Sequence, residues 1–453
     1  MKAHDLVYGL RTAGDPQLSP DGEFIVYALA QADPAAPTER PRSRLWRARR
    51  DGSQAVALTA AGGRHNLPRI SPDGATVAFT SEREGESAVF TVPLEGGEPV
   101  QVAAHPFSIT WLAWAPDSRR LAYTAPVEPE DETAGPSPIV RVTRRPDYKE
   151  DVRGYLGGRR IQAFVADVAE RSTRQVSQGP NDSMFPVFSP DGRTLAFRSS
   201  HATGMRSHLV LHDLETGAET EVRVGDEATA SVAVWSFSPT GDRILLSASP
   251  ERIPQPDLFL YTIASGELER LTDDLEVVPD AGQPNSVPPS PLVWLDGDRV
   301  LLHGQFRGGS GLHELSVGSR ALSPLTDWKA TNVGLSTDRA GRWAVQSHAS
   351  LESVGEISLF DRETGTTTIV TGYNTELLAA SPAARWERME VQRGEFTTEA
   401  WVLFPPGFDE AKRYPLVMDI HGGPHAHHGY MFNPIQQAIA GSGVIVVCPN
   451  PRG

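Results

Sequence analysis

The stretch ISPDGATVAFTS, residues 70–81, is the most informative part of the sequence, because close copies of it recur along most of the chain. In each copy an apolar residue ends one strand. Pro-Asp-Gly then provides a fixed φ, a side-chain cap and a position for φ > 0, after which apolar alternation resumes. Each copy therefore predicts a β-hairpin. The other copies are LSPDGEFIVYAL (18–29), WAPDSRRLAYTA (114–125), FSPDGRTLAFRS (188–199), FSPTGDRILLSA (237–248) and the degraded WLDGDRVLLHGQ (294–305) and LSTDRAGRWAVQSH (335–348).

A second pattern follows each hairpin, in which apolar residues run into a turn and out again, as in SAVFTVPLEGGEPVQVA at 87–103. Two hairpins per repeat predict a four-stranded antiparallel sheet. One such sheet cannot cover both of its faces alone, so the repeats predict an all-β seven-bladed β-propeller over about residues 18–380. A pair of β-sandwiches, the alternative, does not explain a sevenfold repeat. Residues 1–17 form an N-terminal segment, for which packing on the C-terminal domain is one expectation.

An insertion separates the third and fourth copies, and its acidic, Pro-rich part at 126–139 is followed by a basic, aromatic part. So polar a segment must lie on the surface. A solvated loop is the preferred interpretation, since charge runs usually face solvent. In the alternative, Arg144, Arg145, Tyr148 or Arg159 reaches toward a ligand such as a peptide carboxylate.

The composition of the 453 residues, 39% hydrophobic and 22% charged, is that of a globular protein. The net charge of −15 argues against nucleic acid as a partner. No apolar stretch reaches the roughly 18 residues that a membrane span needs, and the charged N-terminus does not fit a secretory signal. We therefore expect a cytoplasmic protein without a membrane partner. The single cysteine, Cys448, lies in an apolar run and is expected to be a buried thiol.

The repeat pattern stops after residue 380. Two alternating segments, 387–393 and 396–404, predict an antiparallel strand pair. The run YPLVMDI (414–420) is typical of a strand buried on both faces of a parallel sheet, and VIVVCPNPRG (444–453) predicts a second such strand.

Start and stop signals for a short helix lie between these two strands, with Asn433 as the cap, Pro434 at the first position and Gly441 past the end. Strand, turn, helix and strand together predict the N-terminal part of an α/β-hydrolase-type domain over residues 381–453. A self-sufficient α/β domain usually takes about 150 residues, so this domain is expected to be incomplete.

The loop after the first of these strands, HGGPHAHHGYMF (421–432), contains two glycines that let backbone N–H groups face a ligand. Such groups stabilise an oxyanion. Gly423 is the better donor candidate and Gly422 permits the turn, whereas His421 is interpreted as a scaffold residue rather than a general base. No metal is expected, because the other loop histidines have no partner Cys and no HExxH motif.

The nucleophile of this fold should be a serine in G-x-S-x-G, and no such pentapeptide occurs in the 453 residues. Triad residues follow the oxyanion loop in chain order. We therefore expect no complete catalytic apparatus in this chain, with the triad lying after Gly453, and no cofactor.

The SPDG repeats, followed by YPLVMDIHGGPH (414–425) and VIVVCPNPRG (444–453), resemble the prolyl oligopeptidase family (S9) of serine peptidases, in its acylaminoacyl-peptidase branch. The resemblance implies an exopeptidase or oligopeptidase that cleaves short peptides, with the propeller restricting access to a Ser-Asp-His site. It also implies that the Gly423 N–H is the oxyanion donor. The dipeptidyl-peptidase branch fits less well, because the sequence contains no Glu-Glu dipeptide.

The resemblance leaves open whether residues are removed from the acylated N-terminus or from the C-terminus of a peptide. Two other functions remain as alternatives, a non-catalytic propeller that binds peptides or proteins and an esterase of the same fold. A homo-oligomer formed through the propeller or the hydrolase domain is also left open.

Overall fold

The computed structural model describes residues 3–37, 39–83, 86–128, 148–150, 154–200, 206–225, 230–251, 255–273, 277–279, 290–423 and 426–451. The chain is mostly β-sheet, and within these residues α1 (Thr375–Ala380) and α2 (Pro434–Gly441) are the α-helices, together with the short π-helix η1 (Asp5–Gly9). No helix in the described part is long and apolar enough to cross a membrane.

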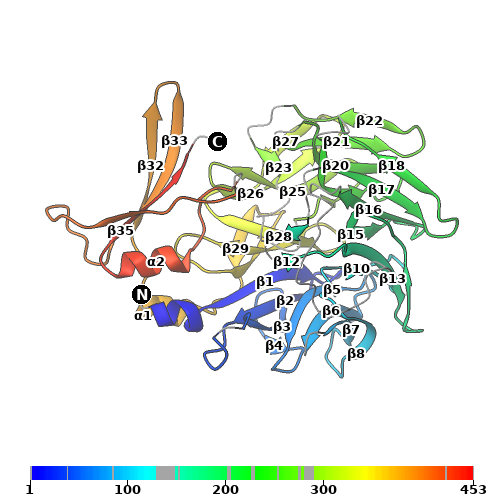
Figure 1. Ribbon diagram of the computed structural model, residues 1–453, viewed down its shortest axis with the longest axis horizontal. Coiled ribbons are helices and arrows are strands. Elements are labelled where there is room, and N and C mark those ends of the chain that lie inside the picture. The colour runs from blue at the N-terminus through cyan, green and yellow to red at the C-terminus, as the bar shows by residue number, and fades with distance from the viewer. Residues whose placement is uncertain are drawn as a thin grey trace.

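Seven successive antiparallel units make up most of the described structure, and the chain runs around them from blue to yellow (Figure 1). Each unit takes its strands from one stretch of sequence, and a single parallel pairing joins the first two units into one sheet. The strands of units one to four are β1 (Arg11–Leu18), β2 (Phe24–Gln31), β3 (Arg42–Arg49), β4 (Val56–Ala57); β5 (Arg64–Ile70), β6 (Thr76–Arg83), β7 (Glu86–Pro93), β8 (Val100–His105); β9 (Trp111–Trp114), β10 (Arg120–Val127), β13 (Arg160–Asp167), β14 (Ser172–Gln175); β15 (Asp182–Phe188), β16 (Thr194–Ser200), β17 (Ser207–Asp213) and β18 (Glu219–Val222).

The remaining units repeat this pattern, and unit six has an additional short strand. Their strands are β19 (Ser231–Phe237), β20 (Arg243–Ser249), β21 (Asp257–Thr262), β22 (Glu267–Arg270); β23 (Val278–Pro279), β24 (Val293–Trp294), β25 (Arg299–Phe306), β26 (Gly309–Ser316), β27 (Ala321–Pro324); β28 (Thr331–Thr337), β29 (Trp343–Ala349), β30 (Glu356–Asp361) and β31 (Thr366–Ile369). The inserted hairpin of β11 (Lys149–Glu150) and β12 (Gly154–Tyr155) stands between β10 and β13.

The Ser-Pro-Asp-Gly turns join the first two strands of a unit through a small hydrogen-bond network. Ser19 Oγ donates to Asp21 Oδ1 (2.5 Å) and accepts from the Phe24 N–H (2.9 Å), while Gly22 has a φ of 73°. The Ser19 bond lowers the pKa of Asp21 below its ordinary value. The same network recurs in the second and fourth units, around Ser71, Asp73, Ser189 and Asp191. The serine that precedes Pro-Asp-Gly thus also stabilises the turn, through these two hydrogen bonds.

The innermost strand of several units contains a register shift, where a residue with positive φ precedes a proline. These residues are Asp15 (φ 49°), Leu67 (φ 52°) and Phe185 (φ 57°). The repeat therefore extends upstream of the turn, and the first unit begins with β1 at Arg11. Residue 18, the predicted start of the propeller, is the last residue of β1. The Ser-Pro-Asp-Gly turn comes after the inner strand of a unit, so the unit starts before the turn.

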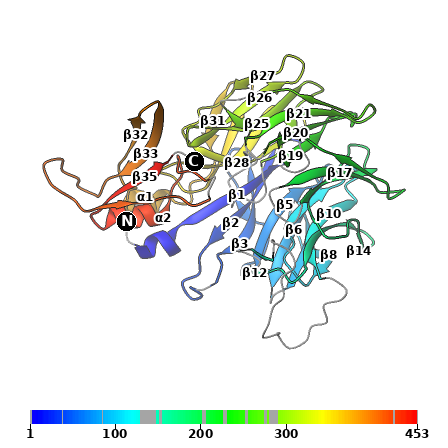
Figure 2. The same ribbon diagram turned by 45° about the horizontal axis from the view of Figure 1, so that its top comes forward.

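The first and last units pack against each other and close the ring. Their shared core includes Ile25 and Tyr27 from one side and Val345 and Ile357 from the other. The Ala13 N–H donates to the Gly355 carbonyl (2.9 Å). The turned view shows β1 running from the N-terminal helix into the ring (Figure 2). Closure depends on side-chain packing and on a few hydrogen bonds, since in the described residues no strand of unit seven pairs with a strand of unit one.

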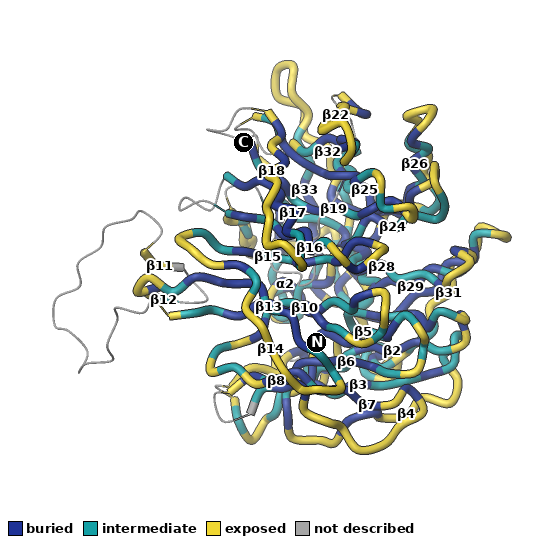
Figure 3. The backbone as a smooth tube through the Cα atoms, turned by 90° about the vertical axis from the view of Figure 1, so that its right-hand side faces the viewer, coloured by how far each residue is buried: buried dark blue, intermediate teal, exposed yellow. Residues whose placement is uncertain are grey.

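The middle strands of a unit are the most buried and the outermost strand is the most exposed, as in the fourth and fifth units (Figure 3). The second strand β20 is almost wholly buried, whereas all residues of the fourth strands β14 and β31 are exposed. Neighbouring units cover the faces of the middle strands, for example through the core formed by Leu209, Ile244 and Leu246. The faces of each sheet are therefore buried only by its neighbours.

A separate sheet follows the ring, with the strand order β32 (Trp386–Arg393), β33 (Phe396–Leu403), β35 (Ile445–Asn450) and β34 (Leu416–Met418). The predicted pairings are present, β32 with β33 antiparallel and β34 with β35 parallel. The predicted helix is α2, whose Asn433 Oδ1 accepts the Ile435 N–H (2.9 Å).

Burial of the run 414–420 is the prediction that was wrong in this sheet. Leu416, Met418 and Ile420 are 57%, 56% and 65% exposed. The physical reason is that β34 is the edge strand and that no element in the described part of the chain packs over it.

The N-terminal segment lies beside the last sheet, and α1 and α2 are near it (Figure 1). Leu6 and Leu10 are buried in a cluster with Phe432 and the partly buried Leu377. This contact brings residues from both ends of the sequence together.

Between units six and seven, a fully buried histidine has both ring nitrogens bonded. His303 Nδ1 lies 2.9 Å from Ser290 Oγ and Nε2 lies 2.8 Å from Gln346 Oε1. The Gln346 oxygen only accepts, so Nε2 carries a proton. Burial lowers the pKa of His303 to about 4.

Acid should therefore destabilise the fold through His303. Its pKa is near 6.5 when unfolded, so its contribution is complete above pH 6.5 and is lost as the pH falls toward 4. Between pH 7 and pH 5 the wild type should lose about 2 kcal/mol more unfolding free energy than His303→Leu. Guanidinium chloride unfolding of both proteins at the two pH values measures this. Equal losses would contradict the assignment.

Candidate functional site

The segment of residues 421–432, here called the His-Gly loop, follows shortly after β34, and its first two glycines are exposed. Gly422 and Gly423 are exposed, and His421 is half-buried. Gly423 has a φ of 141°, a conformation that side-chain-bearing residues rarely adopt. A Cβ on Gly422 would meet nothing within 4 Å. The backbone at these positions is thus open to a ligand, as an oxyanion donor requires.

His428 anchors the loop to the strands on either side of it. Its Nε2 donates to the Asp419 carbonyl (2.9 Å), at the end of β34. Its backbone N–H donates to Asn450 Oδ1 (2.7 Å), and Asn450 Nδ2 donates back to the His428 carbonyl (3.0 Å). Burial lowers the pKa of His428. Both ring and backbone of His428 hold the loop in place, and the Asn450 of the PNPRG motif has a structural role.

The other described loop histidines also make local contacts. Gln305 Nε2, on β25, donates to His427 Nε2 (3.0 Å), which ties the loop to the ring. His421 Nδ1 lies 3.0 Å from the Gly422 carbonyl, and its ring stands 5.4 Å from that of His428. Burial, and then the neighbouring His421 and His428, lower the pKa of His427. The contacts of these rings are with the loop itself and with β25, and a scaffold role for His421 stays a prediction.

The end of the loop, at Gly429 and Tyr430, packs closely against the turn between β25 and β26. The Tyr430 N–H donates to the Gly308 carbonyl (2.7 Å), and Thr331 Oγ1 donates to the Tyr430 carbonyl (3.0 Å). A Cβ on Gly429 would lie 1.9 Å from the Gly308 oxygen. Glycine at 429 is required by this close approach.

The Tyr430 ring fills an aromatic cluster at the junction of the ring and the last sheet. Trp328, Trp386 and Trp401 each meet it edge-on, with centroids 5.5, 5.7 and 5.7 Å away. Trp328 belongs to the ring and Trp401 to β33, so the cluster spans both parts. Tyr430 is 4% exposed. Tyr430 was not singled out by the sequence analysis. The available signals were the aromatic residues Trp401 and Tyr430 and the Gly308-Gly309 pair, but nothing in the sequence shows that they meet.

Asp419, His428 and Cys448 are the described residues that could in principle share a metal ion, since one donor atom from each lies within 4.8 Å of the others. In the structure these donor groups are engaged in other ways. Burial raises the pKa of Cys448 to about 12, so the thiol keeps its proton. Both His428 nitrogens are already engaged, with Asp419 and with Gln436.

The binding residues suggested for the insertion do not form one described site. Arg144 and Arg145 lie outside the described residues. Tyr148 is 45% exposed and packs against Tyr155, with ring centroids 6.1 Å apart. Arg159 instead lines a cavity between the first three units.

Comparisons with known proteins relate the chain to peptidases. It is 26% identical over 469 residues to an uncharacterized peptidase, YuxL, of Bacillus subtilis, matching 99% of this chain and 70% of that protein. It is 26% identical to dipeptidyl-peptidase 5 of Porphyromonas endodontalis, matching 100% of this chain and 67% of that protein. No family model matches.

Solved structures show the same fold at low identity. The Pyrococcus horikoshii acylaminoacyl peptidase superimposes with a TM-score of 0.77 at 17% identity, over 100% of this chain and 66% of that one. A puromycin-hydrolyzing peptidase of Mycobacterium tuberculosis gives a TM-score of 0.76 at 15% identity, over 99% and 68%. The chain thus spans about two thirds of the length of these proteins.

The architecture is therefore that of the propeller-containing S9 peptidases. Relatives named as peptidases and structures of the acylaminoacyl-peptidase type thus confirm the resemblance to the prolyl oligopeptidase family that was inferred from the motifs.

The junction at Gly429 can be tested by adding one methyl group. Gly429→Ala should lower the unfolding free energy by about 1–3 kcal/mol, because the new Cβ meets the Gly308 carbonyl. The matched control is Gly422→Ala, in the same loop but with open space around it, which should change stability by less than about 0.5 kcal/mol. Denaturant unfolding followed by tryptophan fluorescence measures both. Similar losses in the two variants would refute the close contact.

Proposed function

We propose that this chain forms the seven-bladed propeller and the first part of the α/β-hydrolase domain of a serine exopeptidase or oligopeptidase of the acylaminoacyl-peptidase type, and that the propeller limits access to short peptides. The observation that carries the proposal is the loop His421–Gly423. It follows a parallel strand, exposes its glycines, and is held against the ring through Tyr430 and Gly308. In this fold such a loop supplies one oxyanion donor.

The serine nucleophile is proposed to lie outside residues 1–453, since no G-x-S-x-G occurs among them. The chain by itself is then inactive. Release of dipeptides from the N-terminus is the second candidate, because relatives matched over nearly the whole chain are named dipeptidyl-peptidase 5. A self-contained binding module is a weaker alternative, since Leu416, Met418 and Ile420 would leave an apolar strand in water.

The substrates proposed are short peptides, and nucleic acid is not a proposed partner given the charge of −15. Placement in the cytoplasm and a homo-oligomeric state belong to the same proposal.

Activity assays separate these functions. Residues 1–453 should not react with a fluorophosphonate and should not hydrolyse N-acetyl-alanine or dialanine p-nitroanilide. A protein that carries these residues with a C-terminal continuation containing G-x-S-x-G should do both, and the faster substrate identifies the branch. Labelling of a serine within residues 1–453, or an inert longer protein, would refute the proposal.

In the active, longer protein the oxyanion role can be tested at Gly423. Gly423→Ala should reduce kcat by about 100-fold with little change in KM, because alanine cannot hold the φ of 141° that orients the N–H. The control Gly297→Ala, in a turn of unit six where the added Cβ would meet only Arg243 at 4.0 Å, should leave kcat unchanged. An unchanged kcat in Gly423→Ala would remove Gly423 from the oxyanion hole.

A further inference from the structure

A cavity of about 640 Å³ opens between the first three units, at the beginning of the inner strands. Thr12 and Gly14 on β1 and Asn66 on β5 line it, together with the loop that follows β12. The Ser-Pro-Asp-Gly turns lie at the other end of the same strands. In each unit the turn between the second and third strands lies on the side of the ring where the inner strand begins. The β25–β26 turn, which contacts Tyr430, is such a turn, so the cavity and the His-Gly loop lie on the same side of the ring.

The cavity wall is largely apolar. Phe107, Ile109, Pro126 and Leu156 contribute to it, and Ile109 and Leu156 are buried. Such a wall with a few polar groups is typical of a small-ligand site.

Two carboxylates and two arginines line this cavity, and each carboxylate has an arginine partner outside the lining. Asp15 is neutralised by Arg69, at 2.9 Å, and Glu82 faces Arg64 at 3.8 Å. Arg40 and Arg159 also line the cavity, and within the described residues neither contacts a carboxylate. Both lining carboxylates are thus paired with arginines outside the lining, which leaves Arg40 and Arg159 as the lining arginines available to a ligand.

Arg159 is held in position by the backbone of the insertion. Its Nε donates to the Leu156 carbonyl (3.1 Å) and its Nη2 to the Tyr155 carbonyl (3.0 Å). The guanidinium lies 5.2 Å from the centre of the Phe107 ring. A guanidinium has five N–H donors, so these two bonds leave donors for a carboxylate.

We propose that this cavity binds the C-terminal residue of a short peptide, with the free carboxylate on Arg159 and an apolar side chain against Phe107 and Ile109. The inference rests on the proposed peptidase function and makes it more specific. Such a cavity would select peptides with a free C-terminus and an apolar last residue, whereas the sequence left open which end of the peptide is recognised.

Calorimetric binding to the chain of residues 1–453 tests this without any catalytic step. The probes are N-acetyl-Ala-Ala-Phe, its C-terminal amide, and N-acetyl-Ala-Glu-Phe-amide, whose only carboxylate is on a side chain. We expect the first to bind at least about 10-fold more tightly than both amides, as one charge-assisted pair allows. Equal binding of the acid and either amide, or no binding of the acid, would overturn the proposal.

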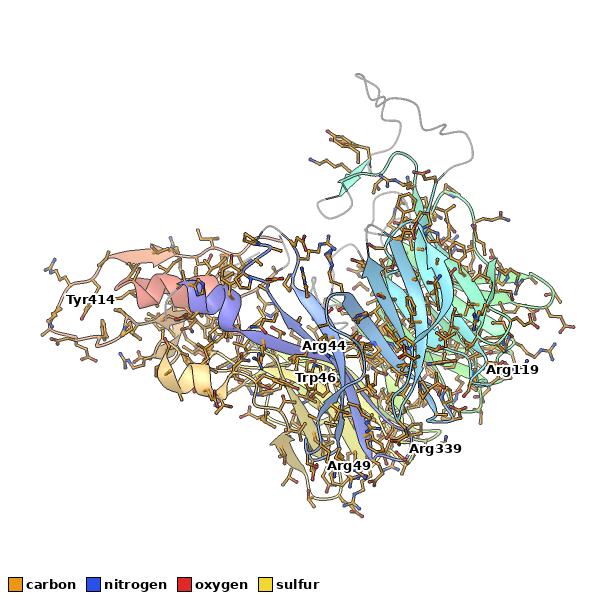
Figure 4. All side chains as sticks on the ribbon, turned by 90° about the horizontal axis from the view of Figure 1, so that it is seen from below. Arg44, Trp46, Arg49, Arg119, Arg339 and Tyr414 are labelled. Atoms are coloured by element: carbon orange, nitrogen blue, oxygen red, sulfur yellow. The ribbon has the colours of Figure 1, made fainter. Side chains whose placement is uncertain are left out.

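Variants locate the interaction. Arg159→Gln should reduce the affinity for the acid to that for its amide, and Arg159→Lys should restore part of the preference. The matched control is Arg119→Gln, an exposed arginine labelled at the end of the molecule opposite Tyr414 in Figure 4. It should bind the acid like the wild type. An Arg159→Gln protein that folds and still prefers the acid would refute the site.

The two proposals can fail separately. Acid-selective binding with an inert longer protein would refute only the peptidase function. An active longer protein that cleaves the acid and the amide equally well, together with unselective binding, would refute only the carboxylate site.

Discussion

The contact of Tyr430 with the ring is the constraint on which the arrangement of the two parts depends. Its N–H is bonded to the Gly308 carbonyl, and its ring is enclosed by Trp328, Trp386 and Trp401. Removal of a large buried aromatic side chain typically costs about 3–5 kcal/mol. The cluster joins unit six to β33, so the same contacts that stabilise the last sheet also orient it on the ring.

The conformation of the His-Gly loop follows from that contact. With Tyr430 fixed on one side and Asp419 on the other, His427 and His428 bond to Gln305 and Asp419. These histidines therefore hold the loop in place, and the backbone at Gly423 stays exposed. The cavity beside Arg159 lies on the same side of the ring as this loop, so the two proposed sites face the same way.

Features that depend on neighbouring residues could be predicted from the sequence, whereas contacts between distant residues could not. The turns around Ser19 and Ser71, and the cap at Asn433, depend on residues a few positions apart, and the sequence shows these directly. The oxyanion candidate Gly423 could be predicted for the same reason, since a strand followed by Gly-Gly is a local signal. Its role stays a prediction until activity is measured.

The features that the sequence did not reveal join distant residues. The packing of Tyr430 on Gly308 and the exposure of Leu416 are set by which surfaces meet, and periodicity carries no such information. Arg159 could not be told apart from Arg144 and Arg145 by composition, because only the position of the inserted hairpin brings it to the cavity.

The coupling of the two parts through Tyr430 is tested most directly by native-state hydrogen exchange on the wild type and Tyr430→Ala. If the aromatic junction positions the last sheet, amides of β33, β35 and the loop at 426–432 should exchange faster together in the variant, while β6 in unit two keeps its protection. If only the amides next to residue 430 change, the last sheet is held by other contacts and the account is wrong.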